Sequence, residues 1–261
     1  MSLIDKTIGA SLIDILQMNN SNNGIDTTAR YIKDGEGTQC AVAISDDTVA
    51  VRPNNDDTTG AFTVVSALGT SVLAVDTTNQ LVTASGNIVN TQYAYFMVDM
   101  SDTSNFAANT HQPIPFQGGM SSILYPPTFG TTTDPALSFT TSDGNGTRAS
   151  DLIPMIWFVP DAISIDSVTS FEGADAATGD TTRMHLFSYT FTSGSTSALT
   201  SGTLLAHNSD VTNAGSEQLY KSTWTVDSAS VAASKVILAF LRSDSVNSDY
   251  AINITVKYHL T

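Results

Sequence analysis

The sequence predicts an all-β protein, and three observations lead to this prediction. Only 13% of its 261 residues are charged, which is about half the usual share. Thr, Ser, Asn and Asp supply most of the polar side chains, and these residue types favour strands and turns over helix interiors. Short alternating apolar stretches recur between clusters of turn residues, which is typical of strands joined by tight loops.

The first 30 residues predict an N-terminal arm. Their apolar positions follow no sustained helical or strand period, and they end in the polar stretch NNSNNG. Two interpretations stay open: a short element folded back on the next domain, or a segment that orders against a partner. In the second case the anchoring contacts would come from Leu3, Ile4, Ile8, Leu12, Ile13, Ile15 and Leu16.

Residues 31 to 88 predict a small β domain or short shaft. The stretch AVAISDDTVAVR (41–52) indicates a hairpin whose turn holds two aspartates. Its larger apolar residues share one face, and alanines occupy the other. Such thin strands cannot enclose much core alone, and identical chains are the simplest neighbours. We therefore expect a homotrimer contact through Val42, Ile44, Val49 and Val51.

Residues 89 to 261 predict an antiparallel β-sandwich. About ten longer strand candidates occur here at the spacing of sandwich domains. The clearest lies at 250–260, where Ile252, Ile254 and Val256 alternate with Asn253 and Thr255. This pattern predicts one buried and one wet face.

Two further strand candidates, LIPMIWFV (152–159) and VILAFL (236–241), are apolar on both faces. One face can fill the sandwich. The other meets either a partner subunit or a thick core within one chain, and we expect the subunit contact because monomers rarely expose such patches. Its predicted residues are Ile156, Trp157, Phe158, Leu238 and Phe240.

No residue pattern indicates a catalytic, metal or cofactor site, so we expect no enzyme activity. The histidines His111, His185, His207 and His259 lie on separate elements, whereas zinc needs three or four converging ligands. Nucleophile-elbow and phosphate-loop motifs are missing. Two oxygen-rich loops, 54–60 and 142–148, lack the complete calcium pattern and fit ordinary turn chemistry. Cys40 is the single cysteine, and we expect a buried, inert thiol.

The charge balance argues against two classes of partner. The chain has 10 Lys and Arg against 25 Asp and Glu, a net charge of −15. Nucleic-acid binding requires cations that neutralise phosphates, and an anionic membrane surface repels an acidic chain. No stretch reaches the roughly 18 apolar residues of a membrane span, and no secretory signal is visible. We therefore expect synthesis in a cytoplasm.

The segment GAFTVVSALGTSVLAVDTTNQLVTASGN (60–87) resembles a short β-repeat of tailed-phage fibres and related trimeric virion proteins. The resemblance rests on Val64, Gly69, Leu73, Val75, Asp76 and Val82. Residues 23–53 are similar to leaders of marine phage virion proteins, and the later segments are similar in order to their C-terminal jelly-roll heads. The resemblance implies a homotrimer anchored on the particle by its N-terminal part, with an outward head and no catalytic residues.

Two functions compete. The first is a capsid decoration or cement protein, or a short head fibre, that trimerises on the capsid surface of the virion, stabilises it and contacts the major capsid protein. The alternative is a receptor-binding tail fibre or spike adhesin that recognises a host glycan or protein. Its aromatic platform would lie in residues 112–134, although packing of these rings against the sandwich is the other interpretation. The rings are Phe116, Tyr125 and Phe129.

Overall fold

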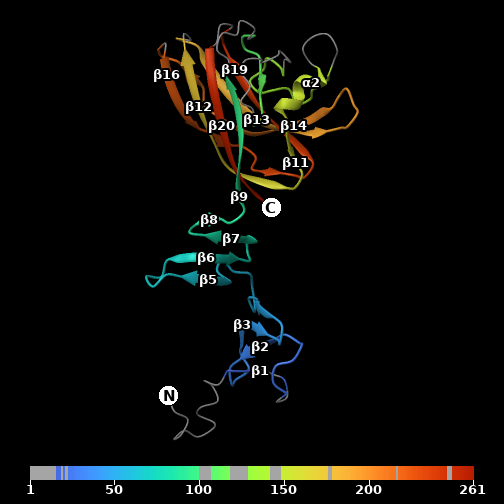
Figure 1. Ribbon diagram of the computed structural model, residues 1–261, viewed down its shortest axis with the longest axis vertical. Coiled ribbons are helices and arrows are strands. Elements are labelled where there is room, and N and C mark those ends of the chain that lie inside the picture. Colours follow the sequence, from blue (N-terminus) through green and yellow to red (C-terminus); the bar gives the residue numbers. More distant parts are fainter. Residues whose placement is uncertain are drawn as a thin grey trace. The chain divides into compact units, whose positions relative to one another are not determined.

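The protein is nearly all β, with 54% strand and 3% helix, which confirms the predicted fold class. The computed structural model (Figure 1) describes residues 16–18, 20, 23–99, 107–117, 129–141, 148–175, 178–215, 217–245 and 249–261. The chain divides into two compact units, Met1–Val89 and Asn90–Thr261. Each unit is described by itself below.

The N-terminal unit contains two four-stranded antiparallel sheets in its described part. The first has the order β1 (Gln17–Met18), β2 (Arg30–Lys33), β3 (Gln39–Ile44) and β4 (Val49–Val51). The second has the order β5 (Phe62–Val65), β6 (Ser71–Asp76), β7 (Leu81–Ala84) and β8 (Asn87–Ile88). Each strand pairs with the next in sequence, so both sheets are meanders built from local hairpins.

The hairpin predicted at residues 41–52 is confirmed. Val42 lies opposite Val51 and Ile44 opposite Val49, and two alanines pair between them. The Ser45 hydroxyl oxygen accepts the backbone N–H of Thr48 at 3.0 Å and closes the turn. This turn fixes the register, so the larger apolar side chains share one face. Cys40, also on β3, is exposed, so the prediction of a buried thiol is wrong because no second layer covers it in the described part of this unit.

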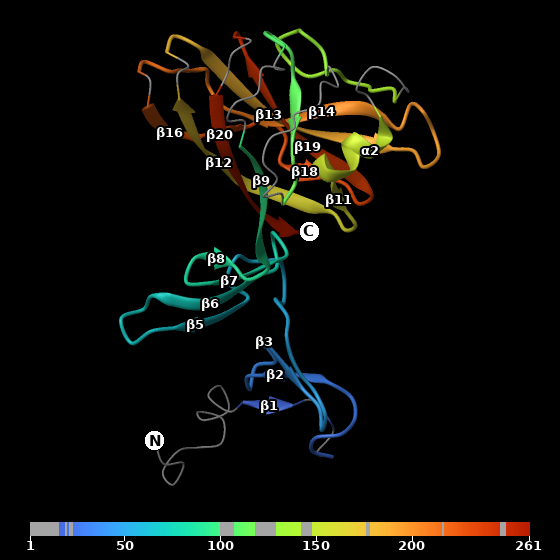
Figure 2. The ribbon, with the colours of Figure 1, turned by 45° about the horizontal axis from the view of Figure 1, so that its top comes forward.

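The C-terminal unit, which we call the head, is a β-sandwich (Figure 2). One sheet has the order β16 (Glu217–Thr223), β12 (Ile163–Asp175), β20 (Asp249–Leu260) and β9 (Thr91–Asp99), with β18 (Ser230–Val231) beside β12. The other has the order β10 (Gln112–Ile114), β19 (Lys235–Ser243), β13 (Thr181–Phe191), β14 (Leu199–His207) and β17 (Thr225–Val226). There β11 (Trp157–Val159) pairs with β19, and β15 (Val211–Thr212) with β13.

The eight principal strands of the head pair in a nested order. The first, β9, neighbours the last, β20, and β10 neighbours β19. Inside these pairs, β12 neighbours β16 and β13 neighbours β14. This arrangement is a long hairpin rolled into two layers, which is the strand order of a jelly roll.

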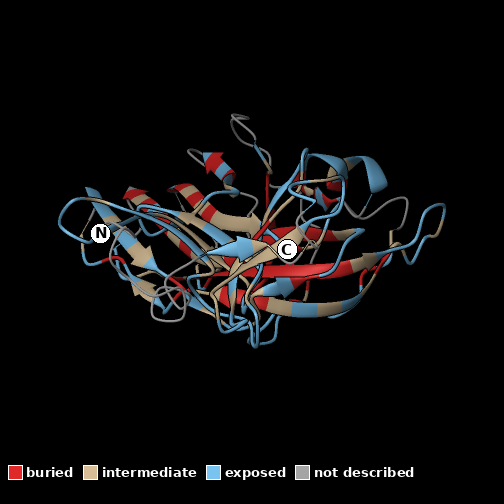
Figure 3. Cartoon of the chain, turned by 90° about the horizontal axis from the view of Figure 1, so that it is seen from below, coloured by how far each residue is buried: buried red, intermediate tan, exposed pale blue. Residues whose placement is uncertain are grey.

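An inner core fills the space between the two sheets. On β20, Ile252, Ile254 and Val256 are buried, whereas Asn253 and Thr255 are partly exposed, so the predicted alternation is confirmed. Buried residues gather along the strands of the sandwich in Figure 3. This inner core accounts for one apolar face of each principal strand.

A second core covers the outer face of the sheet that contains β19. Leu238 and Phe240 are fully buried there against Phe129 and Phe139, and Phe129 stacks on Phe139 with ring centroids 4.1 Å apart. Both faces of β19 are thus covered by the same chain. Residues 129–139, which we call the covering segment, lie over this face. The prediction that Leu238 and Phe240 contact a partner subunit is therefore wrong, because the sequence pattern did not reveal that this segment covers them.

Residues 152–159 form less strand than predicted. They begin in α2 (Ala149–Leu152), pass through the 3-10 helix η2 (Ile153–Met155), and only then enter β11. Trp157 is buried in the inner core and Ile156 packs on the outer core, so the predicted subunit contact is wrong for Trp157. Phe158, which points away from the core, remains 52% exposed.

A close backbone approach holds the covering segment on the outer face. The Tyr189 hydroxyl donates to the carbonyl oxygen of Ala136 at 2.9 Å, and the Gly202 N–H donates to that of Leu137 at 2.7 Å. A Cβ at position 202 would lie 3.0 Å from the Leu137 Cα and 2.8 Å from the Tyr189 ring. Glycine at this point of β14 therefore permits the contact.

The inner core holds one buried acid, Glu172 on β12. The Thr182 hydroxyl lies 2.7 and 2.8 Å from its two carboxyl oxygens. Burial raises the pKa of Glu172 from 4.5 to about 7, and the Thr182 hydrogen bond only partly opposes this. The folded head therefore holds this proton more tightly than the unfolded chain does.

The Glu172→Gln variant is expected to be more stable than the parent at alkaline pH. Because the folded pKa of Glu172 lies above the unfolded one, the parent loses stability as pH rises from about 4.5 through about 7. Glutamine keeps an acceptor for Thr182 without a proton to lose. Urea unfolding should show a relative gain of about 3 kcal/mol on going from pH 4.5 to pH 8.5. If the free energies of unfolding of variant and parent differ by the same amount at both pH values, the raised pKa of Glu172 is contradicted.

Candidate functional site

The N-terminal unit leaves its large apolar side chains uncovered. Ala43 is the only buried apolar residue among the described residues up to Val89. The large apolar side chains that are exposed in the same part are those of Leu16, Ile25, Val49, Val51, Phe62, Val64, Val65, Leu68, Val72, Val82 and Val89. Where such exposed side chains are contiguous, they mark an interaction site.

The second sheet of this unit has one continuous apolar face. The register aligns Phe62, Val75 and Val82 in one row and Val64, Leu73 and Ala84 in the next. We call these six residues the shaft face; none of them is buried. On the opposite face the register aligns Thr63, Ala74 and Thr83. Hydrophobic alternation thus builds a two-sided sheet whose apolar side has no cover within the described part of the unit.

The turn between β5 and β6 fixes the shape of this hairpin. Gly69 has a φ of +82°, a conformation that glycine adopts without strain, and its N–H donates to the Ser66 carbonyl oxygen at 2.9 Å. Leu68, at the tip, is 94% exposed. The glycine of the repeat-like motif thus has a conformational role, while its apolar residues form the shaft face.

The predicted contact residues on the first sheet are accessible in the single chain. Val49 is 71% exposed and Val51 is also exposed, whereas Val42 and Ile44 are half-buried. The four side chains share one face of β3 and β4. They are placed as a contact with another chain requires, and that contact stays a prediction.

Most of the predicted anchoring residues lie outside the described residues. These are Leu3, Ile4, Ile8, Leu12, Ile13 and Ile15. The seventh, Leu16, is described and 72% exposed.

Of the three rings considered for an aromatic platform, the two described ones pack on the head, as the other interpretation expected. Phe129 is fully buried in the outer core, and Phe116 stacks on Trp157 with ring planes 8° apart. Tyr125 lies outside the described residues. The prediction of an exposed platform is wrong for Phe129, because this ring packs on the sheet.

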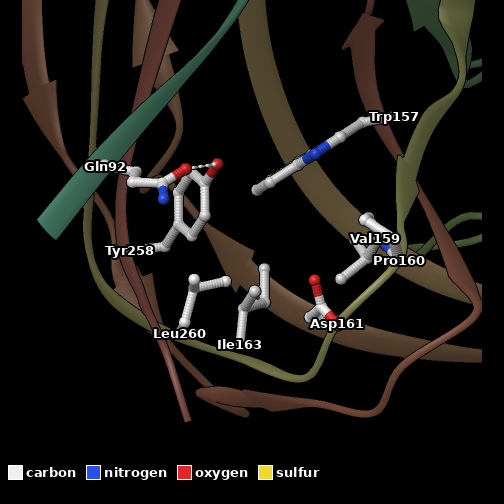
Figure 4. Close-up of a pocket in the computed structure, with 8 residues that line it drawn as sticks. All are labelled: Gln92, Trp157, Val159, Pro160, Asp161, Ile163, Tyr258 and Leu260. Atoms are coloured by element: carbon white, nitrogen blue, oxygen red, sulfur yellow. Dashed lines mark hydrogen bonds between the residues drawn. The ribbon is translucent and has the colours of Figure 1, made fainter. Parts of the chain in front are cut away.

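A pocket of about 170 Å³ opens at one end of the head (Figure 4). Its lining comes from the start of β9, from β11 and the turn after it, and from the ends of β12 and β20. The residues are Gln92, Trp157, Val159, Pro160, Asp161, Ile163, Tyr258 and Leu260. The Trp157 and Tyr258 rings lie against each other, with centroids 5.0 Å and ring planes 57° apart, and Trp157 is buried. We call this space the head pocket.

Sequence reasoning missed the head pocket. Gln92 and Tyr258, which are 166 positions apart, are joined by a hydrogen bond of 2.9 Å from the tyrosine hydroxyl to the glutamine side-chain oxygen. Their neighbourhood depends on β9 pairing with β20. A local pattern therefore carries no signal for it, and Trp157 was assigned a different role.

Three of the four histidines gather on the outer face of the sheet of β13. The His111 and His185 rings are 4.9 Å apart, and those of His185 and His207 are 6.4 Å apart. His111 Nδ1 lies 3.1 Å from the Gly130 carbonyl oxygen, and His207 Nδ1 lies 2.7 Å from Asp227. Among the described residues no set of three His, Cys, Asp or Glu side chains has the arrangement of a metal site.

Burial keeps two of these histidines neutral. It lowers the pKa of His111 to about 4 and that of His185 to about 3. Nearby Arg183 and Arg242 act in the same direction on His185. Among the described residues, neither ring nitrogen of His185 has a hydrogen-bond partner, although an Asp134 oxygen lies 3.5 Å from Nε2. This cluster is therefore a packed part of the outer core.

Comparisons with known proteins do not assign the chain to a family. A scan against protein-family models finds no matching family, and a search of curated proteins finds no match. Within the described ranges, no helix has the length and apolar character needed to cross a membrane. Geometry and the sequence resemblance are therefore the basis for inferring function.

The His185→Phe variant is expected to tolerate acid better than the parent. In the unfolded chain a histidine takes up a proton near pH 6.5, while His185 in the folded head stays neutral down to about pH 3. Stability is therefore lost as pH falls below about 6.5, and phenylalanine removes this loss. Urea unfolding should show a relative gain of about 2 kcal/mol for the variant on going from pH 7.5 to pH 5. If the free energy of unfolding falls equally in parent and variant, the lowered pKa of His185 is contradicted.

Proposed function

We propose that the protein is a non-enzymatic structural component of a virus particle, a capsid decoration or cement protein or a short head fibre. Three chains associate through their N-terminal units, and each carries a jelly-roll head. The observation that supports this best is the shaft face, an ordered apolar sheet surface that no described residue of this unit buries.

The energetics favour association of this unit. Phe62, Val64 and Val82 are each between 40% and 44% exposed. Covering what remains exposed on such a side chain contributes on the order of 1–2 kcal/mol at about 25 cal/mol per Å². The shaft face and the four residues on β3 and β4 together offer several times this amount per chain. Each sheet has only four short strands in the described part of the chain, and small sheets with so little buried core are marginally stable, so a covering layer would add stability.

Copies of the same chain are the simplest cover. Closed symmetry lets identical surfaces bury one another without leaving a free edge or face. The residues of the shaft face and of the face shared by β3 and β4 are uncharged, so charge complementarity does not favour a different partner. The number three and the virion location rest on the resemblance of residues 23–87 and of the strand order to trimeric virion proteins. Jelly rolls also occur in capsid proteins, which agrees with this proposal.

The capsid position is preferred over the tail position. Phe129 is buried rather than exposed, which removes part of the aromatic platform on which the adhesin alternative depended. The major capsid protein is the proposed partner, contacted by the apolar residues between Leu3 and Leu16 of the N-terminal arm (residues 1–30).

The Val64→Asp variant is expected to fall apart into single chains. Its carboxylate would lie on the shaft face, on the edge strand β5, and burying an unpaired charge in the contact is strongly unfavourable. Sedimentation should give about three times 27.5 kDa for the parent and 27.5 kDa for the variant. Thr63→Asp, on the same strand but the opposite face, is the matched control and should remain a trimer. A parent at single-chain mass, or equal dissociation of both variants, would contradict the proposed association.

A chain lacking residues 1–16 is expected to remain a trimer and to lose capsid binding, because the apolar arm is removed while both sheets stay. Co-sedimentation with purified capsids measures the binding, and immunogold labelling of virions locates the parent. Label over the shell supports the capsid position. Label at the tail tip, or undiminished capsid binding by the shortened chain, would contradict it.

A further inference from the structure

The sheet of β16, β12, β20 and β9 carries large apolar side chains on its outer face. Tyr93, Tyr95 and Met97 project from β9, Phe171 from β12 and Leu219 from β16. Each of them is between 38% and 73% exposed. We call these five residues the head face. The outer face of a sandwich sheet is usually polar, so an apolar patch on it indicates a contact.

The strand register brings these side chains together. Figure 2 shows the four strands side by side. Phe171 lies beside Asn253, and Asn253 lies beside Met97, in one row across β12, β20 and β9. In the next row along the strands Tyr95 lies beside Thr255. Neighbouring strands are about 4.8 Å apart, so the apolar side chains are separated only by short polar ones and form one patch.

The two sheets of the head differ in how their outer faces are covered. The covering segment buries the outer face of the sheet that contains β19. No described residue of the chain buries the head face, since all five of its side chains are exposed. Its cover must therefore come from outside the described part of the chain.

Charge favours a second copy of the chain as this cover. Lys221 and Lys257 lie within the face, whereas its carboxylates, those of Asp99 and Glu217, lie toward one end. The chain as a whole carries −15, so the surface of a second copy is mainly acidic. A face whose central charges are positive is where two such chains attract each other.

The size of the head face fits a contact between tethered heads. At about 200 Å² for a large side chain, its five residues expose on the order of 500 Å², which is less than the roughly 800 Å² that each partner buries in a stable complex. The tether is short, because β8 ends at Ile88 and β9 begins at Thr91. Associated N-terminal units would thus hold the heads at millimolar effective concentration, where a weak contact persists.

We propose that the heads of associated chains pack on one another, with each head face lying against the head of a neighbouring copy. The apolar side chains supply the contact area, and Lys221 and Lys257 attract the acidic surface of the neighbour. This inference rests on the proposed association of the N-terminal units. It adds a second contact, made by the heads, which that association does not require.

Hydroxyl-radical labelling of the full-length protein tests this contact, because the rate at which a side chain is oxidised reports its exposure to solvent. In the parent, Tyr95, Met97 and Phe171 should react at least about threefold more slowly than in the Val64→Asp variant, since tethered heads spend most of their time in contact. Phe191 is the internal reference. It is 44% exposed on the other sheet and should react equally fast in both proteins.

A matched pair of variants tests the face itself. Phe171→Glu places a carboxylate opposite an acidic neighbour, so Tyr95 and Met97 should react as fast as in Val64→Asp. Its sedimentation should remain that of a trimer, because the shaft face is unchanged. Phe191→Glu makes the same change at a similarly exposed ring outside the face, and there the slow reaction of Tyr95 and Met97 should persist. Thermal unfolding checks that both variants fold.

The outcomes separate the head contact from the association on which it rests. A trimeric parent whose head face reacts as fast as that of Val64→Asp overturns the head contact and leaves the association intact. Equal labelling of Tyr95 and Met97 in Phe171→Glu and Phe191→Glu also overturns it. A parent that sediments at single-chain mass overturns both. If Phe171→Glu does not fold, the comparison of the parent with Val64→Asp decides.

Discussion

The whole structure depends on removing apolar surface from water, and the two units meet this constraint differently. The head covers its own strands, with an inner core between the sheets and an outer core beyond β19. The N-terminal unit buries almost nothing by itself in its described part, where Ala43 is the one buried apolar residue. The head thus has two cores of its own, although Tyr95, Phe171 and Leu219 on its other sheet stay exposed, whereas the N-terminal unit is proposed to gain its cover from neighbouring chains.

The two cores of the head also decide where binding chemistry can occur. Because the segment around Phe129 and Phe139 fills the outer face, the histidine cluster beside it is packed and holds no metal site in the described residues. The open space lies instead at the end of the sandwich, where Trp157 meets Tyr258. Aromatic side chains therefore have different roles at different depths: filling a core, walling a pocket or staying exposed.

The sequence allowed the fold class to be predicted because alternation is a local property. The hairpin at 41–52 and the alternation of Ile252, Ile254 and Val256 follow directly from it. The roles of Leu238 and Phe240 could not be predicted in this way. Their second face is covered by residues about 100 positions away in the chain. A strand that is apolar on both faces has the same sequence pattern whether a partner subunit or a loop of its own chain covers the second face. The head pocket could not be predicted either, because its lining residues come from strands that are far apart in the sequence.

The nested strand order also sets a sequence of events during synthesis. The N-terminal sheets need only neighbouring hairpins and can form as soon as they leave the ribosome. The head cannot close until β20 has been made, because β20 is the central partner of both β9 and β12, and contacts between distant segments form slowly. Nascent chains therefore expose the shaft face well before their heads are finished, so the proposed association between chains can begin on one polysome before each head is complete.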